Sequence, residues 1–367
     1  MHPTKAEMYT MGRDSLLAHW NLHQRKQIRG ALMTEGPADA IAISNSGKWL
    51  AIGYNNGALQ ILDAETLKSI KIRRDRKKKT KNVSIQVIKF SPDDRYLAVG
   101  GHDRSIITYD VQANFKPMKR INTHNATVNH IDFSQDGESI MSLDGAYEIL
   151  FHNITDGSQI THASQFKDEE WATWTSKMGW PVQGIFPPCA DGTDINSCDR
   201  SPDGQVLATG DDFRMVKLFK YPCPVEEAQY QKYSGHSEHV TNVQFSRHNK
   251  GINYLISTGG EDKCIMQWKY DMDGIPDDEQ DEDDEGEQVQ FKENPDISDA
   301  EYDDEDDEEE VKRPQRAQKK AADDPFAEDE LDDGDERGCM ELWRGVVDNT
   351  LPDEYKRPSK AMSQAPE

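Results

Sequence analysis

The feature that most limits how this chain can fold is a polar turn signal that recurs at a nearly constant interval. Five such clusters begin with a serine, at Ser44, Ser91, Ser134, Ser201 and Ser246. The intervals between them are 47, 43, 67 and 45 residues, so three fit one unit of about 40–45 residues and the long one holds an insertion. A repeat of this length predicts one supersecondary unit per repeat, each of which must stack on its neighbours.

The residues around the turns alternate between apolar and polar, which indicates β-strands. Around the second turn, short runs occupy residues 87–90, 96–100 and 105–110, and no window shows a sustained helical period. Four strands in a unit of this length form a propeller blade. Because one blade leaves both of its faces apolar, several blades must close around an axis. The sequence therefore predicts an all-β fold, a β-propeller.

The number of units predicts a short ring or a piece of a longer one. Five full units run from about Arg25 to Tyr270, and a partial unit at Met8–Leu22 has Asp14 and Trp20 where a repeat would end. A seven-bladed ring of this repeat length needs roughly 300 residues. We therefore expect about six blade units that form a small, irregular ring or belong to a larger assembly.

The last unit shows most clearly which repeat this is. Gly235-His236 precedes one apolar run, Asp262 follows another, and Trp268 lies in a third. This pattern resembles the WD repeat, in which a His, a strand Ser or Thr, a turn Asp and a Trp form a hydrogen-bonded chain. The resemblance assigns that structural chain to His236, Thr258, Asp262 and Trp268.

Two earlier units keep less of this pattern. One has Asp103 but ends in Tyr109-Asp110, and the next has His124 without a preceding glycine and ends at His152. We expect these blades to rely more on apolar packing than on a polar chain.

A basic segment, residues 73–81 (RRDRKKKTK), separates two units. Two interpretations stay open: a solvated loop that keeps sheet edges apart, or a contact for an acidic partner surface such as tubulin or nucleic acid. The candidate contact residues are Arg73, Arg74, Arg76, Lys77, Lys78, Lys79 and Lys81.

The composition changes abruptly after the repeats. Residues 271–367 hold 37 of the 68 acidic residues and 11 of the 43 basic ones, so the negative charge of the chain belongs to its tail. We expect residues 1–270 to form the propeller and residues 271–340 to be an acidic, disordered linker. Gln288–Lys292 alternates in polarity and could add an outer strand to the last blade.

The remaining chemistry is sparse. The five cysteines have no zinc-ligand spacing, and the chain shows no secretory signal and no apolar run long enough to cross a bilayer, which favours a soluble, intracellular protein with reduced thiols. We find no phosphate loop, H-E-x-x-H or G-x-S-x-G motif. His236 and His239 have only a loose metal-like spacing, and Asp271–Gly274 is only a fragment of a calcium loop. We therefore expect no enzymatic activity, no cofactor and no metal site.

The long interval contains the most unusual stretch, residues 171–196. It holds three tryptophans and three prolines within an atypical blade that spans about residues 158–223. We expect Trp171, Trp174 and Trp180 to fill a wedge beside that blade. Pro181 and the two later prolines would keep added strands from pairing onward at an open edge.

Specific motifs in and after this stretch carry a family resemblance. They are W-x-T-W-T from Trp171, V-Q-G-I-F-P from Val182, and D-G-T-D-I-N from Asp191, which includes Asp194. Together with the Thr209–Phe213 and Tyr221–Cys223 sequences, they resemble the EMAP-like (echinoderm microtubule-associated protein-like) family. The resemblance covers about His2 to Tyr270.

The resemblance implies a function and a larger architecture. Members of that family fuse two propellers in tandem and associate with microtubules in the cytoplasm, spindle or cilia, so residues 1–270 would correspond to the second, atypical propeller. The hydrophobic motif that opens the family's first propeller and the trimerising coiled coil of many members are not found in this sequence. Residues 341–367, with Leu342–Val347 and Pro352–Pro358, are similar to a linker that precedes a further tandem copy; the alternative is an exposed tail.

Two functions of different class follow. The first is a non-enzymatic scaffold of the cytoplasm and cytoskeleton, including the cilium or axoneme, which binds tubulin, microtubules or axonemal partners through the propeller; we expect no nucleic acid or membrane partner. The alternative is a soluble WD-repeat hub whose acidic tail binds basic proteins. A propeller hydrolase would need converging catalytic groups on the axis, and the sequence identifies none.

Overall fold

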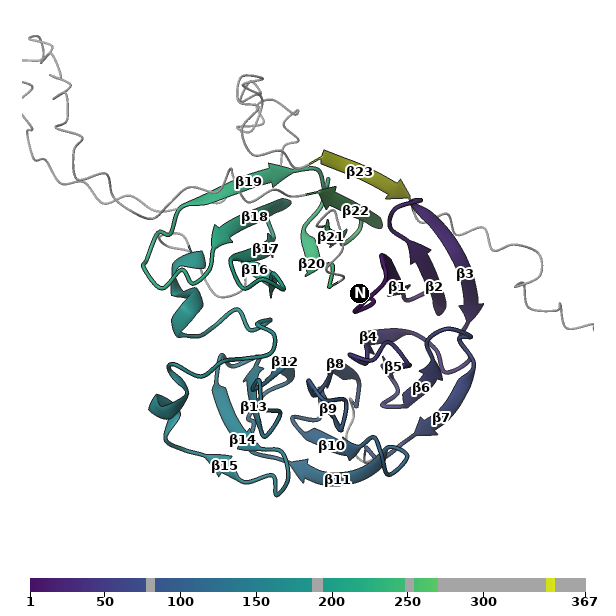
Figure 1. The fold of residues 1–367 in the computed structure, drawn as a ribbon, viewed down its shortest axis with the longest axis vertical. Helices are drawn as coiled ribbons and strands as arrows, with labels where there is room; N and C mark the ends of the chain where they lie inside the picture. Colours follow the sequence, from purple (N-terminus) through teal and green to yellow (C-terminus); the bar gives the residue numbers. More distant parts are fainter. Residues whose placement is uncertain (77–82, 187–193, 248–253, 270–340, 347–367) are drawn as a thin grey trace, which may run out of the picture. The chain divides into compact units, whose positions relative to one another are not determined.

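A computed structural model describes residues 1–76, 83–186, 194–247, 254–269 and 341–346, the last range as backbone only. Its described residues form six antiparallel sheets arranged as the blades of a propeller, which confirms the predicted fold class and number of units (Figure 1). The ring closes within these residues. The expectation of a small, irregular ring is therefore the one that the structure supports.

Each blade is a run of strands that are consecutive in the chain, apart from one late addition. Blade 1 has β1 (Glu7–Met11), β2 (Leu16–Asn21) and β3 (Lys26–Leu32); blade 2 has β4 (Ala38–Ile43), β5 (Trp49–Tyr54), β6 (Leu59–Asp63) and β7 (Ser69–Arg73); blade 3 has β8 (Ile85–Phe90), β9 (Tyr96–Gly101), β10 (Ile106–Asp110) and β11 (Lys116–Ile121). Blade 4 has β12 (Val128–Phe133), β13 (Ser139–Asp144), β14 (Ile149–Asn153) and β15 (Gln159–Ile160); blade 5 has β16 (Ile195–Arg200), β17 (Val206–Asp211), β18 (Met215–Lys220) and β19 (Tyr230–Ser234); blade 6 has β20 (Val240–Phe245), β21 (Tyr254–Gly259), β22 (Cys264–Lys269) and β23 (Glu341–Val346).

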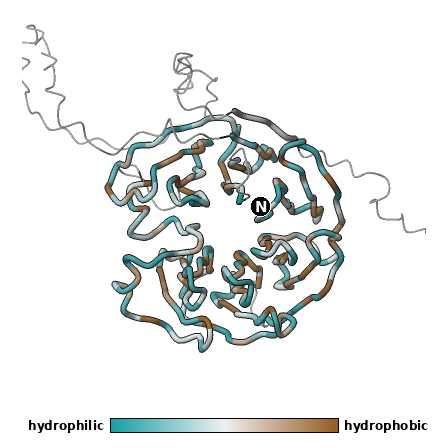
Figure 2. Tube along the Cα trace, viewed as in Figure 1, coloured by the Kyte–Doolittle hydropathy of each residue, from teal (hydrophilic) through white to brown (hydrophobic). Residues whose placement is uncertain are grey.

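The position of a strand in its blade explains its sequence. Central strands such as β9 are buried along their whole length because neighbouring blades cover both faces. Outer strands such as β7 and β11 are more polar, and most of their residues are exposed or half-buried. Figure 2 shows the resulting mixture of hydrophobic and hydrophilic segments around the ring. In blades 2 to 6, the register between the first and second strands shifts near the start of the first strand. Such a bulge increases local twist, and it recurs at the same place in each of these blades.

Apolar clusters between neighbouring blades form the core. One cluster joins each successive pair of blades, and the cluster between blades 6 and 1 contains Met8, Leu22, Tyr254, Ile256 and Ile265. The same junction has polar links, because the Gln267 side chain donates a hydrogen bond to the Leu22 carbonyl over 3.2 Å. Blade 1, with only three strands, therefore still closes the ring.

The outer strand of blade 6 comes from the start of the segment that we expected to be a linker. β23 pairs with β22 in antiparallel register from Lys269↔Glu341 to Cys264↔Val346. β21 occupies one side of β22 and β23 the other. Gln288–Lys292 lies outside the described residues, so its assignment as an outer strand of this blade stays a prediction. The start of the segment expected to be a linker is thus part of the last blade, while residues 347–367 lie outside the described residues.

The insertion, residues 161–194, joins β15 to β16, and its described residues form no additional strand. It contains two 3₁₀ helices, η1 (Ala163–Phe166) and η2 (Trp180–Ile185), and a single isolated bridge between Ser134 and Trp171. The expectation of added strands was wrong within the described residues. Pro181 instead begins the first turn of η2, where its fixed φ and missing N–H are tolerated.

Candidate functional site

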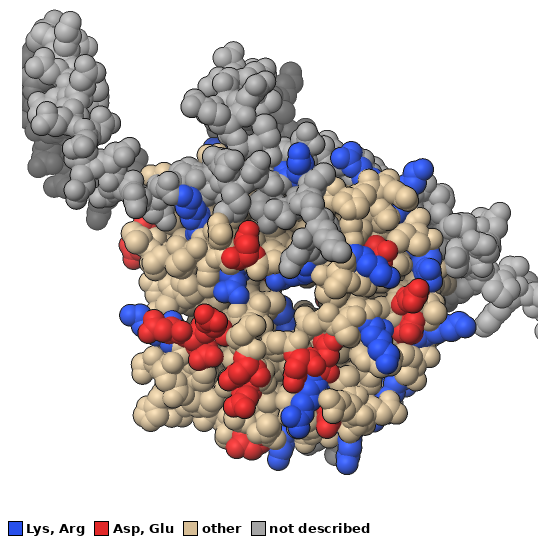
Figure 3. Space-filling model, viewed as in Figure 1, with Lys and Arg blue, Asp and Glu red and all other residues tan. Residues whose placement is uncertain are grey.

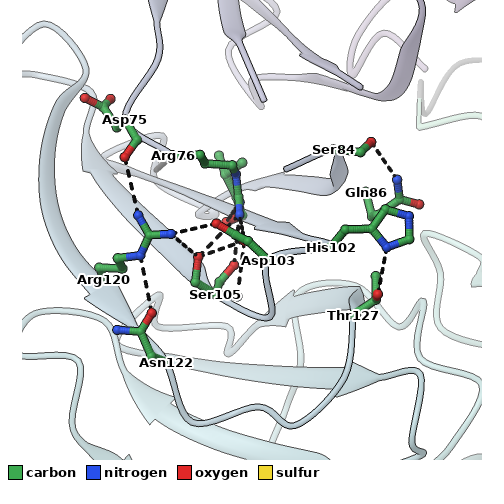
Figure 4. Close-up of polar contacts among 11 residues, drawn as sticks. Asp75, Arg76, Ser84, Gln86, His102, Asp103, Ser105, Arg120, Asn122 and Thr127 are labelled. Atoms are coloured by element: carbon green, nitrogen blue, oxygen red, sulfur yellow. Dashed lines mark hydrogen bonds and ion pairs between the residues drawn. The ribbon is translucent and has the colours of Figure 1, made fainter. Parts of the chain in front are cut away.

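The basic segment, residues 73–81, begins at the last residue of β7 and contains a buried arginine, Arg76. The Arg76 side chain is only 2% exposed and forms an ion pair with Asp103, a residue of the turn between β9 and β10 (Figure 4). It also donates hydrogen bonds to the Val99 carbonyl over 2.9 Å and to the Ser105 hydroxyl over 3.3 Å. These contacts make Arg76 a structural residue, so its prediction as a surface contact was wrong.

A second arginine completes this polar network. Arg120 on β11 binds the other carboxylate oxygen of Asp103 over 2.6 Å and the Ser105 hydroxyl over 3.1 Å (Figure 4). Burial lowers the pKa of Arg76, and Asp103 opposes that shift. An arginine remains charged after such a shift, so the carboxylate of Asp103 is shared between two cations.

The network replaces the histidine chain of a complete WD blade. In blade 4, His124 binds Ser142 over 2.8 Å and Asp144 over 3.2 Å, and in blade 3 Arg76 contacts the corresponding Asp103 and a nearby serine. Blades 3 and 4 therefore keep a polar chain, contrary to our expectation that they rely mainly on apolar packing. Arginine can take the place of histidine because its several N–H donors reach the same carboxylate.

The chain in blade 6 differs by one residue from the prediction. His236 binds Asp262 through Nδ1 and the Ser257 hydroxyl through Nε2, both over 2.8 Å, and the Trp268 indole also donates to Ser257 over 2.8 Å. The strand hydroxyl is thus Ser257 and not Thr258. Because successive side chains of a strand point to opposite faces, Thr258 contacts Thr241 instead.

The other predicted basic contacts lie in different environments. Arg73 forms an ion pair with Asp75 over 2.8 Å, and Arg74 reaches Glu35 over 2.5 Å with 56% of its side chain exposed. Lys77, Lys78, Lys79 and Lys81 lie outside the described residues. Among the candidates that the structure describes, Arg74 is the most exposed.

The insertion ties blade 4 to blade 5. On the blade 4 side, Asp132 accepts hydrogen bonds from the Thr173 hydroxyl over 2.5 Å and the Thr175 amide over 2.9 Å. On the blade 5 side, Cys223 donates its amide to the Pro181 carbonyl over 2.9 Å, and Asp212 donates its amide to the Asp194 carbonyl over 2.9 Å. The insertion therefore occupies the space between the two sheets.

The tryptophans of the insertion pack into this junction. Trp171 and Trp174 are buried in one apolar cluster with residues of blades 4 and 5, and Trp180 packs partly buried against it. Gly179, at φ +144°, precedes η2, and a Cβ there would lie 2.5 Å from the Trp174 ring. Only a glycine allows this close approach.

The sequence did not reveal that this junction is hollow. A cavity of about 650 Å³, the aromatic pocket, lies beside the insertion. Its aromatic lining comprises Tyr147, Phe151, Phe166, Trp171, Trp174, Trp180 and Tyr221. The run of tryptophans around a Gly-Trp-Pro turn was the available signal, but it predicts a filled wedge equally well.

In the part of the chain that the structure describes, no three His, Cys, Asp or Glu side chains are grouped so that they could hold a metal ion. His236 is engaged with Asp262 and Ser257, while His239 contacts Glu238 over 3.3 Å. Within the same residues, no helix has the length and apolar character needed to span a bilayer.

Comparison with known proteins identifies the relatives of this chain. The echinoderm microtubule-associated protein-like 2 of Homo sapiens is 38% identical over 271 residues, which are 73% of this chain and 40% of that protein. The 77 kDa echinoderm microtubule-associated protein of Strongylocentrotus purpuratus is 38% identical over 271 residues, 38% of its length. The echinoderm microtubule-associated protein-like 4 of Homo sapiens is 39% identical over 272 residues, 27% of its length.

The chain thus spans well under half the length of these relatives. A family model described as the echinoderm microtubule-associated protein second beta-propeller matches residues 1–270, which contain all of blades 1 to 5 and the first three strands of blade 6. This chain therefore belongs to the echinoderm microtubule-associated protein family, as the resemblance of its insertion motifs implied.

Proposed function

We propose that this protein is a non-enzymatic, microtubule-associated scaffold of the cytoplasm and cytoskeleton. The observation that carries the proposal is family membership across residues 1–270, together with relatives whose names describe them as microtubule-associated. Tubulin or an axonemal protein would be the partner, in the cytoplasm or in a cilium, and this chain could act as one part of a longer tandem-propeller protein.

The basic segment is the contact we favour on the propeller. The outer surface of a microtubule is acidic, and complementary charge accelerates and orients association. Arg76 anchors the start of the segment in blade 3, Arg74 exposes its guanidinium next to it, and four lysines follow in the sequence. The buried ion pair would hold Arg74 close to the rim of the ring.

Charge reversal within the segment tests this role. We expect the triple variant Lys77→Glu, Lys78→Glu and Lys79→Glu to reduce co-pelleting with microtubules by about tenfold at low salt, because each lysine near an acidic surface contributes on the order of 0.5–1 kcal/mol. Near 0.3 M salt, where screening is strong, co-pelleting of the wild-type protein should fall to roughly the level of the variant.

A matched control variant distinguishes a specific contact at this segment from an effect of net charge alone. The variant Lys26→Glu, Lys116→Glu and Lys263→Glu changes the same number of exposed lysines, on β3, on β11 and in the turn before β22. Equal loss of pelleting in both variants would show that only net charge matters, and unchanged pelleting in the first variant would remove the basic segment from the interface.

A further inference from the structure

The aromatic pocket is the feature of this fold that the proposed function leaves unexplained. It lies where the insertion joins blades 4 and 5. Its volume of about 650 Å³ is within the range of protein sites that bind small molecules or peptide side chains. Buried tryptophans and phenylalanines in its lining make its interior largely apolar.

The walls of the pocket are held in place without any ligand. Phe151 stacks on Phe166 with ring centroids 4.5 Å apart, and Trp171 lies 5.9 Å from each of them. The Trp174 indole, another part of the lining, donates to the Ser176 carbonyl over 2.7 Å. These contacts fix the side chains, so the hollow does not depend on flexible residues.

Negative charge gathers at the mouth of the pocket. Asp168, Glu169 and Glu170 follow η1 directly and belong to the pocket lining. Within the described residues, none of the three carboxylates has an ion pair or a side-chain hydrogen bond. Their backbone is fixed, since the Gln135 amide donates to the Glu170 carbonyl over 2.8 Å.

The two cations of the lining do not neutralise these carboxylates. Arg200 donates to the Trp171 carbonyl and lies over the Tyr221 ring at 5.2 Å, so its guanidinium is directed into the wall. Lys167 is exposed beside Asp168 and leaves two of the three negative charges in excess. Acidic side chains are also visible over this side of the ring in Figure 3.

We propose that the aromatic pocket binds a linear peptide of a partner protein, one that inserts an aromatic or proline side chain and places basic residues against Asp168, Glu169 and Glu170. Aromatic-lined grooves recognise proline and aromatic anchors, and apolar burial supplies most of the affinity. The free carboxylates select for flanking lysine or arginine and against acidic neighbours. This site is separate from the basic segment, which lies between blades 2 and 3.

Three fluorescent peptides test the proposal on the full chain. GKRWPKRG carries the anchor and the basic flanks, GEEWPEEG keeps the anchor with reversed charge, and GKRSGKRG keeps the charge without the anchor. Because residues 271–340 are strongly acidic, a basic peptide can bind them without using the pocket. Binding of GKRSGKRG measures that background, so the proposal predicts that GKRWPKRG binds at least about tenfold more tightly than either of the other two.

Two variants locate the binding, and each has a control for folding. Glu169→Lys with Glu170→Lys, and separately Trp180→Ala, should each weaken binding of GKRWPKRG to the level of GKRSGKRG. The control variant Glu65→Lys with Glu261→Lys makes the same charge change at exposed positions in blades 2 and 6 and should leave binding unchanged. A melting curve for every variant shows whether the ring is intact, and Trp180→Phe should restore part of the affinity lost in Trp180→Ala.

Each outcome of these experiments either supports the proposed site or overturns it. Anchor-dependent binding that both pocket variants abolish and the control retains supports the site. Absence of saturable binding by GKRWPKRG above the GKRSGKRG background, equal binding of GEEWPEEG, or equal loss in the blade 2 and blade 6 control overturns it. None of these results depends on microtubules, so the pocket and the proposed scaffold function can fail independently.

Discussion

At the scale of single residues, the blades keep the hydrogen-bonded chain of the WD pattern but have other residue types at some of its positions. Tryptophan closes the polar chain in blade 6, whereas the corresponding end of blade 4 is His152, whose Nε2 contacts the Thr123 hydroxyl over 2.8 Å. Its Nδ1 is buried without a hydrogen-bond partner among the described residues. Burial is the main cause that lowers the pKa of His152 to about 4, and nearby His124 adds to it. A histidine at this position makes the blade sensitive to acid.

That sensitivity gives a prediction with a definite sign. The folded state holds His152 neutral, whereas an unfolded chain binds a proton near the ordinary histidine pKa of about 6.5, so acid favours unfolding between pH 6.5 and 4. The stabilisation is fully present above pH 6.5 and is lost as the pH falls toward 4. We expect His152→Gln to flatten this part of the curve of unfolding free energy against pH by about 1–3 kcal/mol.

Urea titrations at several pH values measure this slope. The exposed His162→Gln is the matched control and should keep the wild-type slope. A His152→Gln slope equal to that of the wild type, in a variant that still unfolds cooperatively, would show that His152 takes up no proton on unfolding.

At the scale of elements, alternation and turn chemistry were sufficient to predict the strands but not every partner. Period-two runs located the blades, and the spacing of the serine turns located the insertion. The sequence could not show that Arg76 replaces a histidine, because a basic run looks the same whether its first residues are buried or solvated. Nor could it place β23, which is separated from β22 by 71 residues, since local patterns carry no information about such distant pairing.

The late strand leads to a prediction about truncation. A chain that ends at residue 270 loses β23 and leaves the outer edge of β22 unpaired. We expect this truncation to destabilise the chain by about 2–4 kcal/mol, because several backbone hydrogen bonds of net ~1 kcal/mol each are lost, and to promote association through the free edge. Thermal melting and light scattering measure both effects.

An internal replacement distinguishes the loss of β23 from the loss of the acidic residues that precede it. A Gly/Ser linker of equal length in place of the strongly acidic residues 279–336 keeps β23. This variant should melt at the wild-type temperature. If the truncated chain and the replacement variant melt alike, β23 contributes nothing measurable to the stability of blade 6.

At the scale of the whole molecule, the charge is divided unequally. Residues 279–336 contain 28 acidic and 6 basic residues, against a net charge of −25 for the entire chain, so the remainder is nearly neutral. The basic segment on the propeller and residues 279–336, the acidic unit, therefore have opposite effects on the binding of a charged partner. An acidic microtubule surface would attract the first and repel the second.

The same Gly/Ser replacement of residues 279–336 tests which charge governs association. If the scaffold proposal is right, removing the acidic unit should strengthen microtubule co-pelleting at low salt, by about tenfold at most, and leave it unchanged near 0.3 M salt, because screening removes the repulsion. Because the linker has the same length, the replacement removes the charge while the segment can still span a similar distance. A clear loss of pelleting would instead assign the interaction to the acidic unit, and capture of a basic protein by residues 279–336 alone would then favour the hub function.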